Sequence, residues 1–178
     1  MEFKKYDTRG AYHWAEYEDK NSVYHSYVNK VLEWVKERPV LDIGCGDGLI
    51  THLFGNGSVG VDNNATAVNL AHDKGVHVVN KSIYEPFETN FDVIFMGDVI
   101  EHLKEWEKAI TNVKNAMSEY SILYITTPPA DPSGKLQDKF HYFEWTQEEF
   151  KTNIESMGFK LVEPIFTNNF RMFGKFTL

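Results

Sequence analysis

The stretch GDVIEHL places acidic and imidazole side chains at a spacing that suits proton transfer or metal binding. Asp98, Glu101 and His102 stand at positions i, i+3 and i+4, so on a helix all three would project from one face. The preceding run FDVIFMG predicts a buried strand, which puts these side chains directly after its carboxyl end. A histidine there could accept a proton from a hydroxyl or an amine. Two carboxylates and an imidazole could instead hold a divalent metal ion.

A second chemical feature is a cluster of glycines, Gly44, Gly46 and Gly48, directly after the apolar run VLDI. Glycines let the chain turn sharply and let backbone approach a ligand without a Cβ in the way. The helix expected to follow offers unpaired N–H groups at its start. A nicotinamide or flavin fingerprint would need a small residue where Leu49 stands, and a P-loop would need Gly-Lys-Ser/Thr. The pattern is D-x-G-x-G-x-G, counted from Asp42.

The composition excludes several classes of protein. The 178 residues carry a net charge of −8, which argues against a protein that grips long nucleic acid. The single cysteine, Cys45, excludes an internal disulfide and a multi-cysteine metal site. We find no apolar run long enough for a membrane span and no signal peptide at the start. We therefore expect a cytoplasmic protein without a membrane partner.

The elements that must position these residues alternate between strands and helices. Strands are expected at 40–44, 58–62, 76–80, 91–97, 121–127, 160–166 and 169–176, with helices at 23–35, 47–55, 64–75, 105–118 and 146–158. Thr146 and Glu149 predict a capping box at the start of the last helix. The alternation indicates an α/β fold, doubly wound, with a mostly parallel seven-stranded sheet, helices on both faces and a C-terminal antiparallel hairpin. In such a fold the ligand lies over the carboxyl ends of the strands.

The glycine pattern resembles motif I of the class I S-adenosylmethionine (SAM)-dependent methyltransferases. Four further stretches resemble family motifs in the expected order: VGVDNN, NKSIYEP, FDVIFMGDVIEHL and SILYITTP, followed by HYFEWTQEEFKTNIESMGF before the closing hairpin. The resemblance covers roughly residues 38–178. It implies one class I methyltransferase domain over 1–178, with 1–37 as an N-terminal helical or lid segment.

The resemblance also implies which residues bind SAM. Gly44 and Gly46 would contact its amino-acid and ribose portion, with Asp42 orienting the loop or meeting the methionine ammonium. Cys45 would fill space. The remaining cofactor residues are Asp62 on the ribose, Asn63, Ser82 and Ile83 around the adenine, and Asp98 and Val99 at the methionine end.

The nature of the acceptor is approached by exclusion. DNA amino-methyltransferases carry D/N-P-P-Y/F where this chain has Gly97-Asp98-Val99-Ile100, and cytosine-C5 enzymes need a catalytic cysteine that Cys45 does not supply. We expect direct methyl transfer to an oxygen or nitrogen of a small molecule, with His102, Glu101 and His141 as catalytic candidates. The aromatic residues Tyr12, Trp14, Tyr17 and Tyr24 would form a lid or pack the first helix onto the sheet.

Two other functions stay open. Small-RNA 3′-terminal 2′-O-methyltransferases of the Hen1 type use an E-x-x-E-H set and a further histidine before a phrase like F-E-W-T. A similar arrangement here would hold a divalent metal through Asp98, Glu101, His102 and His141, and the acceptor would be an RNA 3′ end. The leading interpretation needs no metal. The third possibility is a catalytically inactive cofactor-binding scaffold subunit.

Overall fold

The computed structural model describes residues 4–36, 39–87, 91–168 and 170–178, which belong to two compact units, Met1–Ser82 and Ile83–Leu178. The expected end of the N-terminal segment at residue 37 lies outside the described residues. Among the described helices, none combines the length and the apolar character needed to cross a membrane.

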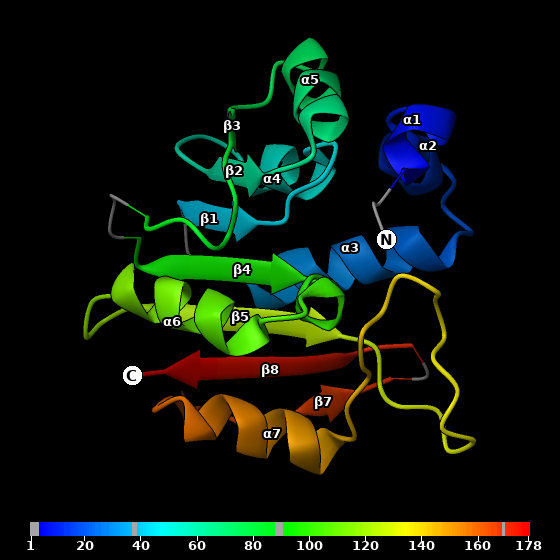
Figure 1. Ribbon diagram of the computed structural model, residues 1–178. Helices are drawn as coiled ribbons and strands as arrows, with labels where there is room; N and C mark the ends of the chain where they lie inside the picture. The colour runs from blue at the N-terminus through cyan, green and yellow to red at the C-terminus, as the bar shows by residue number, and fades with distance from the viewer. Residues whose placement is uncertain (1–3, 37–38, 88–90, 169) are drawn as a thin grey trace. The chain divides into compact units, whose positions relative to one another are not determined.

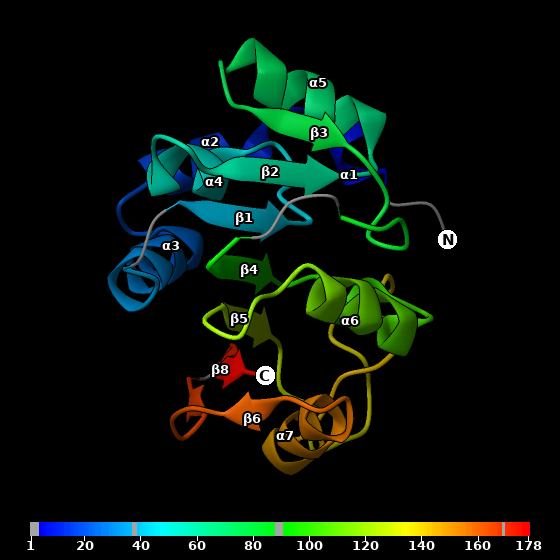
Figure 2. The same cartoon turned by 90° about the vertical axis from the view of Figure 1, so that its left-hand side faces the viewer.

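The first unit begins with three helices, α1 (Lys5–Arg9), α2 (Tyr12–Glu18) and α3 (Val23–Trp34). Strands and helices then alternate as β1 (Val40–Ile43), α4 (Leu49–Phe54), β2 (Val59–Asp62), α5 (Ala65–Asp73) and β3 (Val78–Asn80). Strands β1 and β3 both pair with β2 in parallel, and Figure 2 shows the three side by side. The parallel pairing confirms the alternation predicted from the sequence.

The core of this unit explains how the glycine-containing loop after β1 is held in place. Val68, Ala71, Val76 and Val78 form a buried apolar cluster against which Trp14 and Cys45 pack. At Gly60 of β2, an added Cβ would lie 2.6 Å from the Cys45 sulfur. The loop can therefore lie directly on β2 only because residue 60 has no side chain.

The second unit contains β4 (Val93–Gly97), the 3₁₀ helix η1 (Ile100–His102), α6 (Trp106–Asn115), β5 (Ile122–Thr127) and α7 (Gln147–Ser156). Three strands close the chain: β6 (Lys160–Leu161), β7 (Phe166–Thr167) and β8 (Met172–Thr177). Strands β4 and β5 pair in parallel, while β8 runs antiparallel to β5, β6 and β7. Helices α6 and α7 lie on one side of these strands (Figure 2). The predicted C-terminal antiparallel arrangement is confirmed.

Two details of the second unit bear on the sequence prediction. Helix α7 begins with the predicted capping box, in which Thr146 and Glu149 exchange side-chain and backbone hydrogen bonds. The expected single strand at 160–166 is wrong, because the chain forms two short strands, β6 and β7, separated by Pro164. Proline has no N–H to donate to a strand ladder, so the pairing with β8 is interrupted there. Asn169, expected in the turn before β8, lies outside the described residues.

Candidate functional site

The glycine loop of the first unit is closed by backbone hydrogen bonds to β2. The N–H groups of Gly44 and Cys45 both donate to the carbonyl of Val61, at 2.7 and 3.2 Å. Gly44, Gly46 and Gly48 have φ angles of 72°, 56° and 77°, a region that side-chain-bearing residues rarely adopt. The three glycines are therefore needed for the turn itself, which takes the chain from β1 into α4.

Asp62 at the end of β2 is tied to the same loop. Its Oδ2 accepts the N–H of Gly46 at 2.9 Å and its Oδ1 accepts the N–H of Asn64 at 2.8 Å. Burial raises its pKa, against the lowering effect of these N–H donors. Each carboxylate oxygen keeps a second lone pair, so the group can still accept from ligand hydroxyls.

Asp42 in β1 is buried and faces the start of α4. Its Oδ2 accepts the hydroxyl of Thr51 at 2.6 Å, and burial raises its pKa to about 7. The contact joins β1 to α4 and so fixes the loop between them. Burial also raises the pKa of the Cys45 thiol well above its usual range, which disfavours the reactive thiolate.

The N-terminal helices cover the glycine loop. The hydroxyl of Tyr6 in α1 is the atom nearest to the position that a Cβ on Gly46 would take, at 2.0 Å. Asp47, fully buried, accepts from His13 of α2 through the backbone N–H and contacts its ring Nδ1, both at 3.1 Å. The indole N–H of Trp14 donates to the carbonyl of Asp47 at 2.9 Å. Helices α1 and α2 thus meet the loop through aromatic and polar contacts.

The other aromatic residues of this segment pack among themselves. The ring of Tyr24 stacks on His13 at 4.8 Å between centroids, and that of Tyr17 stacks on His25 at 4.7 Å. The hydroxyl of Tyr17 donates to Asn29 of α3. These contacts hold α2 against α3.

In the second unit, Asp98 follows β4 in a left-handed conformation with φ of 54°. Its carboxylate accepts from Arg171 Nε at 2.6 Å and from the Thr126 hydroxyl at 3.1 Å. Only Ile100–His102 form a helical turn, and it is a 3₁₀ helix. The expectation that Asp98, Glu101 and His102 share one face of an α-helix is therefore wrong, because Asp98 has a positive φ and lies outside this short turn.

Glu101 and His102 nevertheless lie close to His141, which reaches them from the long loop after β5. The loop is held to η1 by two bonds: Tyr142 N–H donates to the carbonyl of Glu101 at 2.8 Å, and His102 Nδ1 donates to the carbonyl of Phe140 at 3.1 Å. Each of the three residues offers one ligand atom, and these atoms lie within 4.8 Å of one another. The rings of His102 and His141 meet edge to face, 4.8 Å apart.

The protonation states in this cluster follow from its burial. Glu101 is 1% exposed, its Oε2 accepts from Thr127 at 3.0 Å, and its Oε1 has no hydrogen-bond partner among the described residues. Burial, with the charge of Asp98 in addition, raises the pKa of Glu101 well above its usual range. Burial lowers the pKa of His102. Because a carbonyl can only accept, neutral His102 carries its proton on Nδ1 and leaves Nε2 with a lone pair.

The predicted site residues divide between the two units. Those in the first unit are Asp42, Gly44, Cys45, Gly46, Asp62, Asn63 and Ser82; those in the second are Ile83, Asp98, Val99, Glu101, His102 and His141. Asn63 is exposed, whereas Ser82, Ile83 and Val99 are half-buried. The carbonyl of Ile83 accepts the amide of Asn112 at 2.9 Å.

The sequence analysis gave no role to three residues that contact predicted site residues or the glycine loop: Tyr6, Asp47 and Glu144. Glu144 contacts His141, three residues before it, and that spacing was visible in HYFE. Tyr6 and Asp47 are far from their partners in sequence, so no local pattern identifies them.

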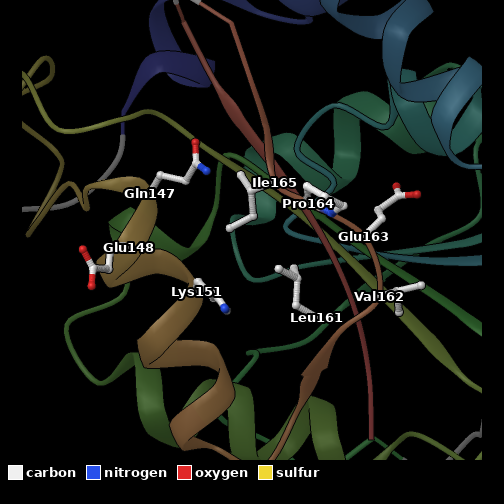
Figure 3. Close-up of a pocket in the computed structure, with 8 residues that line it drawn as sticks. All are labelled: Gln147, Glu148, Lys151, Leu161, Val162, Glu163, Pro164 and Ile165. Atoms are coloured by element: carbon white, nitrogen blue, oxygen red, sulfur yellow. The ribbon is translucent and has the colours of Figure 1, made fainter.

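A groove of about 700 Å³ between α7 and the β6–β7 segment contains none of the predicted site residues (Figure 3).

A family model for a methyltransferase domain matches residues 15–163. The chain belongs to this methyltransferase family. Ubiquinone biosynthesis O-methyltransferase of Glaesserella parasuis serovar 5 (strain SH0165) is 29% identical over 118 residues, 57% of this chain and 50% of the relative. The methyltransferase chain thus spans about half the length of that curated relative.

Solved structures agree on the fold. Magnesium protoporphyrin IX methyltransferase from Synechocystis PCC 6803, with bound S-adenosylhomocysteine (SAH), superimposes with a TM-score of 0.73 and 13% identity, covering 97% of this chain and 95% of that one. The methyltransferase domain of bacterial-CtHen1-CN gives a TM-score of 0.60 and 23% identity over 86% and 96%. The fold is that of a class I SAM-dependent methyltransferase.

The residues of the first unit fit SAM. The glycine loop lies at the carboxyl end of β1, and Asp62, which accepts the N–H of Gly46, keeps acceptor capacity for vicinal hydroxyls. The loop leads into the start of α4, whose first N–H groups lack helical partners. SAM is therefore the cofactor of this methyltransferase domain.

Proposed function

We propose that this protein transfers the methyl group of SAM to an oxygen or nitrogen of a small molecule. The observation that carries the proposal is the closed glycine loop bound to Asp62, together with the relative named as an O-methyltransferase. When bound, SAM supplies an electrophilic methyl group. The chain contributes mainly by positioning, because direct displacement requires the acceptor to lie in line with the methyl group.

The cofactor roles follow the predicted assignments. Asp62 would hold the ribose and the backbone at Gly44 and Gly46 the amino-acid portion, while Asp42 supports the loop from behind through Thr51. Asn63, Ser82 and Ile83 would surround the adenine, and Asp98 with Val99 the methionine end. We further propose that residues 1–37 act as a lid, since α1 and α2 cover Gly46, and that 1–178 is one functional domain in the cytoplasm.

Proton removal from the acceptor is assigned to the cluster of Glu101, His102 and His141. His102 is neutral near pH 7, because burial lowers its pKa, so it has a lone pair available. Burial, with the charge of Asp98 in addition, raises the pKa of Glu101, which favours its protonated form as a hydrogen-bond donor.

Calorimetric titration of SAH tests the cofactor part of this proposal. Wild-type protein should bind one SAH per chain, and Asp62→Ala should bind at least about tenfold more weakly because hydrogen bonds to a charged group are lost. Asp73→Ala, an exposed acidic residue at the end of α5, is the matched control and should bind as wild type. Equal binding by Asp62→Ala and wild type would refute the assigned role of Asp62.

The acceptor is sought by measuring SAH released from SAM with a panel of catechols, phenols, carboxylic acids and amines. Catechol comes first, because the O-methyltransferase relative favours a hydroxyl acceptor. Turnover on any of these compounds would also exclude an inactive scaffold. Binding of SAH without turnover on the whole panel would contradict a small-molecule acceptor of these classes.

A metal-dependent RNA 3′-terminal 2′-O-methyltransferase is the second candidate. It is favoured by the gathering of Glu101, His102 and His141, and by the buried Oε1 of Glu101, which has no hydrogen-bond partner in the part of the chain that the structure describes. Asp98, the fourth ligand expected from the sequence, bonds Arg171 instead. Mn²⁺ titrated into the SAH-saturated protein should bind one-to-one if this candidate is right, and His141→Ala should abolish binding, whereas His77→Ala, an exposed histidine, should not. Absence of binding to the wild type would end this candidate.

A further inference from the structure

We propose that Asp47 is a positioning residue whose carboxylate caps helix α2 and thereby couples the folding of this helix to SAM binding at the glycine loop. The inference rests on the proposed cofactor role of that loop and of Asp62, and it gives a role to a residue that the sequence pattern did not indicate. All the residues concerned belong to the unit Met1–Ser82.

Helix α2 has little to stabilise it locally. It is seven residues long, and isolated helices of that length are marginal in water. Its N-cap residue is Ala11, whose side chain cannot accept a hydrogen bond from the N–H groups of the first turn. Its last turn has no basic residue and contains Glu16 and Glu18, whose negative charges oppose the helix dipole there. The helix therefore depends on contacts from elsewhere in the chain.

Asp47 supplies the contact that Ala11 cannot. Its Oδ2 accepts the backbone N–H of His13, the second residue of α2, at 3.1 Å, and its Oδ1 lies 3.1 Å from Nδ1 of the His13 ring. A carboxylate in this place satisfies a first-turn donor and faces the positive end of the helix dipole, as a local N-cap would. This cap comes from a residue 34 positions further along the chain. The carbonyl of Asp47 also accepts the indole N–H of Trp14 at 2.9 Å, so two successive residues of α2 are bound.

The burial of Asp47 makes the cap and the helix depend on each other. The side chain of Asp47 is fully buried, and a carboxylate removed from water is costly unless hydrogen bonds compensate. If α2 unfolds, the carboxylate loses the N–H of His13 and has to be solvated again. A folded α2 and a buried Asp47 therefore form together.

The position of Asp47 is set by the glycine loop. Its neighbour Gly46 donates its N–H to Asp62 Oδ2 at 2.9 Å, and its other neighbour, Gly48, donates to the carbonyl of Cys45 at 3.1 Å. Both glycines have positive φ, so the direction in which Asp47 points depends on this turn. SAM bound through its ribose to Asp62 would fix the carboxylate that holds Gly46, and with it the adjoining Asp47.

The coupling acts in both directions. If SAM stabilises the loop that presents Asp47, folded α2 strengthens SAM binding by the same factor. Loss of a helix cap changes an equilibrium constant by about tenfold, which sets the expected size of the effect. Other contacts of α2 are made away from the loop: Trp14 packs on the buried cluster that contains Val68 and Val78, and Tyr17 donates to Asn29. They hold the helix to the unit without a link to the ligand.

Amide hydrogen exchange measured by mass spectrometry tests the cap. Saturation of the wild type with SAH should slow exchange over α2, residues 12–18, by about tenfold and leave α3, residues 23–34, within about twofold. Ligand-free Asp47→Ala should exchange about tenfold faster than the wild type over α2. Asp47→Asn keeps an acceptor for the His13 N–H and should recover most of the protection. The exposed control Asp73→Ala should exchange as the wild type does.

Either of two results would overturn the proposal. One is exchange over α2 that is the same in Asp47→Ala and the wild type. The other is exchange over α2 of the wild type that does not respond to SAH, a comparison that decides the matter even if Asp47→Ala does not fold.

A local cap separates the coupling from the stability of the helix. Ala11→Ser introduces a side chain that can cap α2 without Asp47. Combined with Asp47→Ala, it should restore slow exchange over α2. The affinity for SAH, measured by calorimetry, should stay about tenfold below that of the wild type, because helix and loop are no longer joined. Recovery of the affinity together with the helix, or an unchanged affinity in Asp47→Ala, would refute the coupling.

Failure of the proposed function gives a different result. Wild-type protein that does not bind SAH would refute the proposed cofactor site itself. The exchange of ligand-free Asp47→Ala over α2 would still show whether Asp47 caps the helix.

Discussion

Gly46→Ala tests whether helix α1 lies on the glycine loop as described. Two effects act against the new methyl group. The backbone at residue 46 has φ of 56°, which costs about 1–2 kcal/mol for a residue with a Cβ. The Cβ would also lie 2.0 Å from the Tyr6 hydroxyl, a contact that forces the buried Tyr6 ring to leave. Losing the burial of such a side chain costs about 2–3 kcal/mol. The expected total loss of unfolding free energy is about 3–5 kcal/mol.

Two further variants separate these effects. Gly75→Ala has a similar φ of 74° but no atom within 4 Å of its Cβ, so it should lose only the backbone part, about 1–2 kcal/mol. When Tyr6 is already alanine, the substitution Gly46→Ala should also lower the unfolding free energy only by the backbone cost of about 1–2 kcal/mol. Urea unfolding followed by tryptophan fluorescence and circular dichroism gives the free energy of unfolding of the wild type and of the four variants, Gly46→Ala, Gly75→Ala, Tyr6→Ala and the double variant. A Gly46→Ala loss no larger than that of Gly75→Ala, or one independent of Tyr6, would refute the packing of Tyr6 on the loop.

Two other predictions concern stability. Because burial raises the pKa of Asp42 from 3.8 to about 7, the folded chain holds one more proton than the unfolded chain between these values, and stability falls as pH rises through this window. The asparagine of Asp42→Asn does not titrate. Between pH 5 and pH 8, the free energy of unfolding measured in urea should therefore fall by about 3 kcal/mol less for this variant than for the wild type. Parallel curves of unfolding free energy against pH for the two proteins would contradict this assignment. Thr146→Ala removes half of the capping box of α7 and should lower the unfolding free energy by about 1 kcal/mol, whereas Thr146→Ser should recover most of it. Equal losses in the alanine and serine variants would show that the hydroxyl is not the cause.

The sequence was sufficient for most of the fold, because the signals involved are local. Alternating apolar runs, the glycine turn after β1 and the capping box of α7 each act within a few residues, and each is present. The single strand at 160–166 was not predicted correctly, since the apolar pattern continues through Pro164 while the hydrogen bonding does not. Periodicity reports burial and says little about which N–H groups can pair.

The candidate site was predictable only in part, for a similar reason. Glu101, His102 and His141 do come together, although His141 stands 39 positions after His102 and 40 after Glu101, in a loop that no local rule places. The helical spacing of Asp98 was misleading, because Asp98 has a positive φ and lies outside the 3₁₀ turn that contains Glu101 and His102. The contact of Asp98 with Arg171 and that of Tyr6 with Gly46 depend on tertiary packing across more than 39 residues. Such long-range contacts produce no periodic pattern of residue types in the sequence, so they cannot be predicted from periodicity.

Helices α1 and α2 stand beside the loop between β1 and α4 (Figure 1) and contact it through Tyr6, His13 and Trp14, which has a consequence for the time course of the proposed reaction. Each methyl group transferred leaves one SAH behind, so the cofactor must exchange once per cycle. If α1 and α2 act as the proposed lid, SAH leaves only after His13 and Trp14 release Asp47. Opening of these helices would then limit the steady rate. Protein loaded with SAM beforehand should form its first equivalent of product in a fast burst, followed by a slower phase set by the departure of SAH.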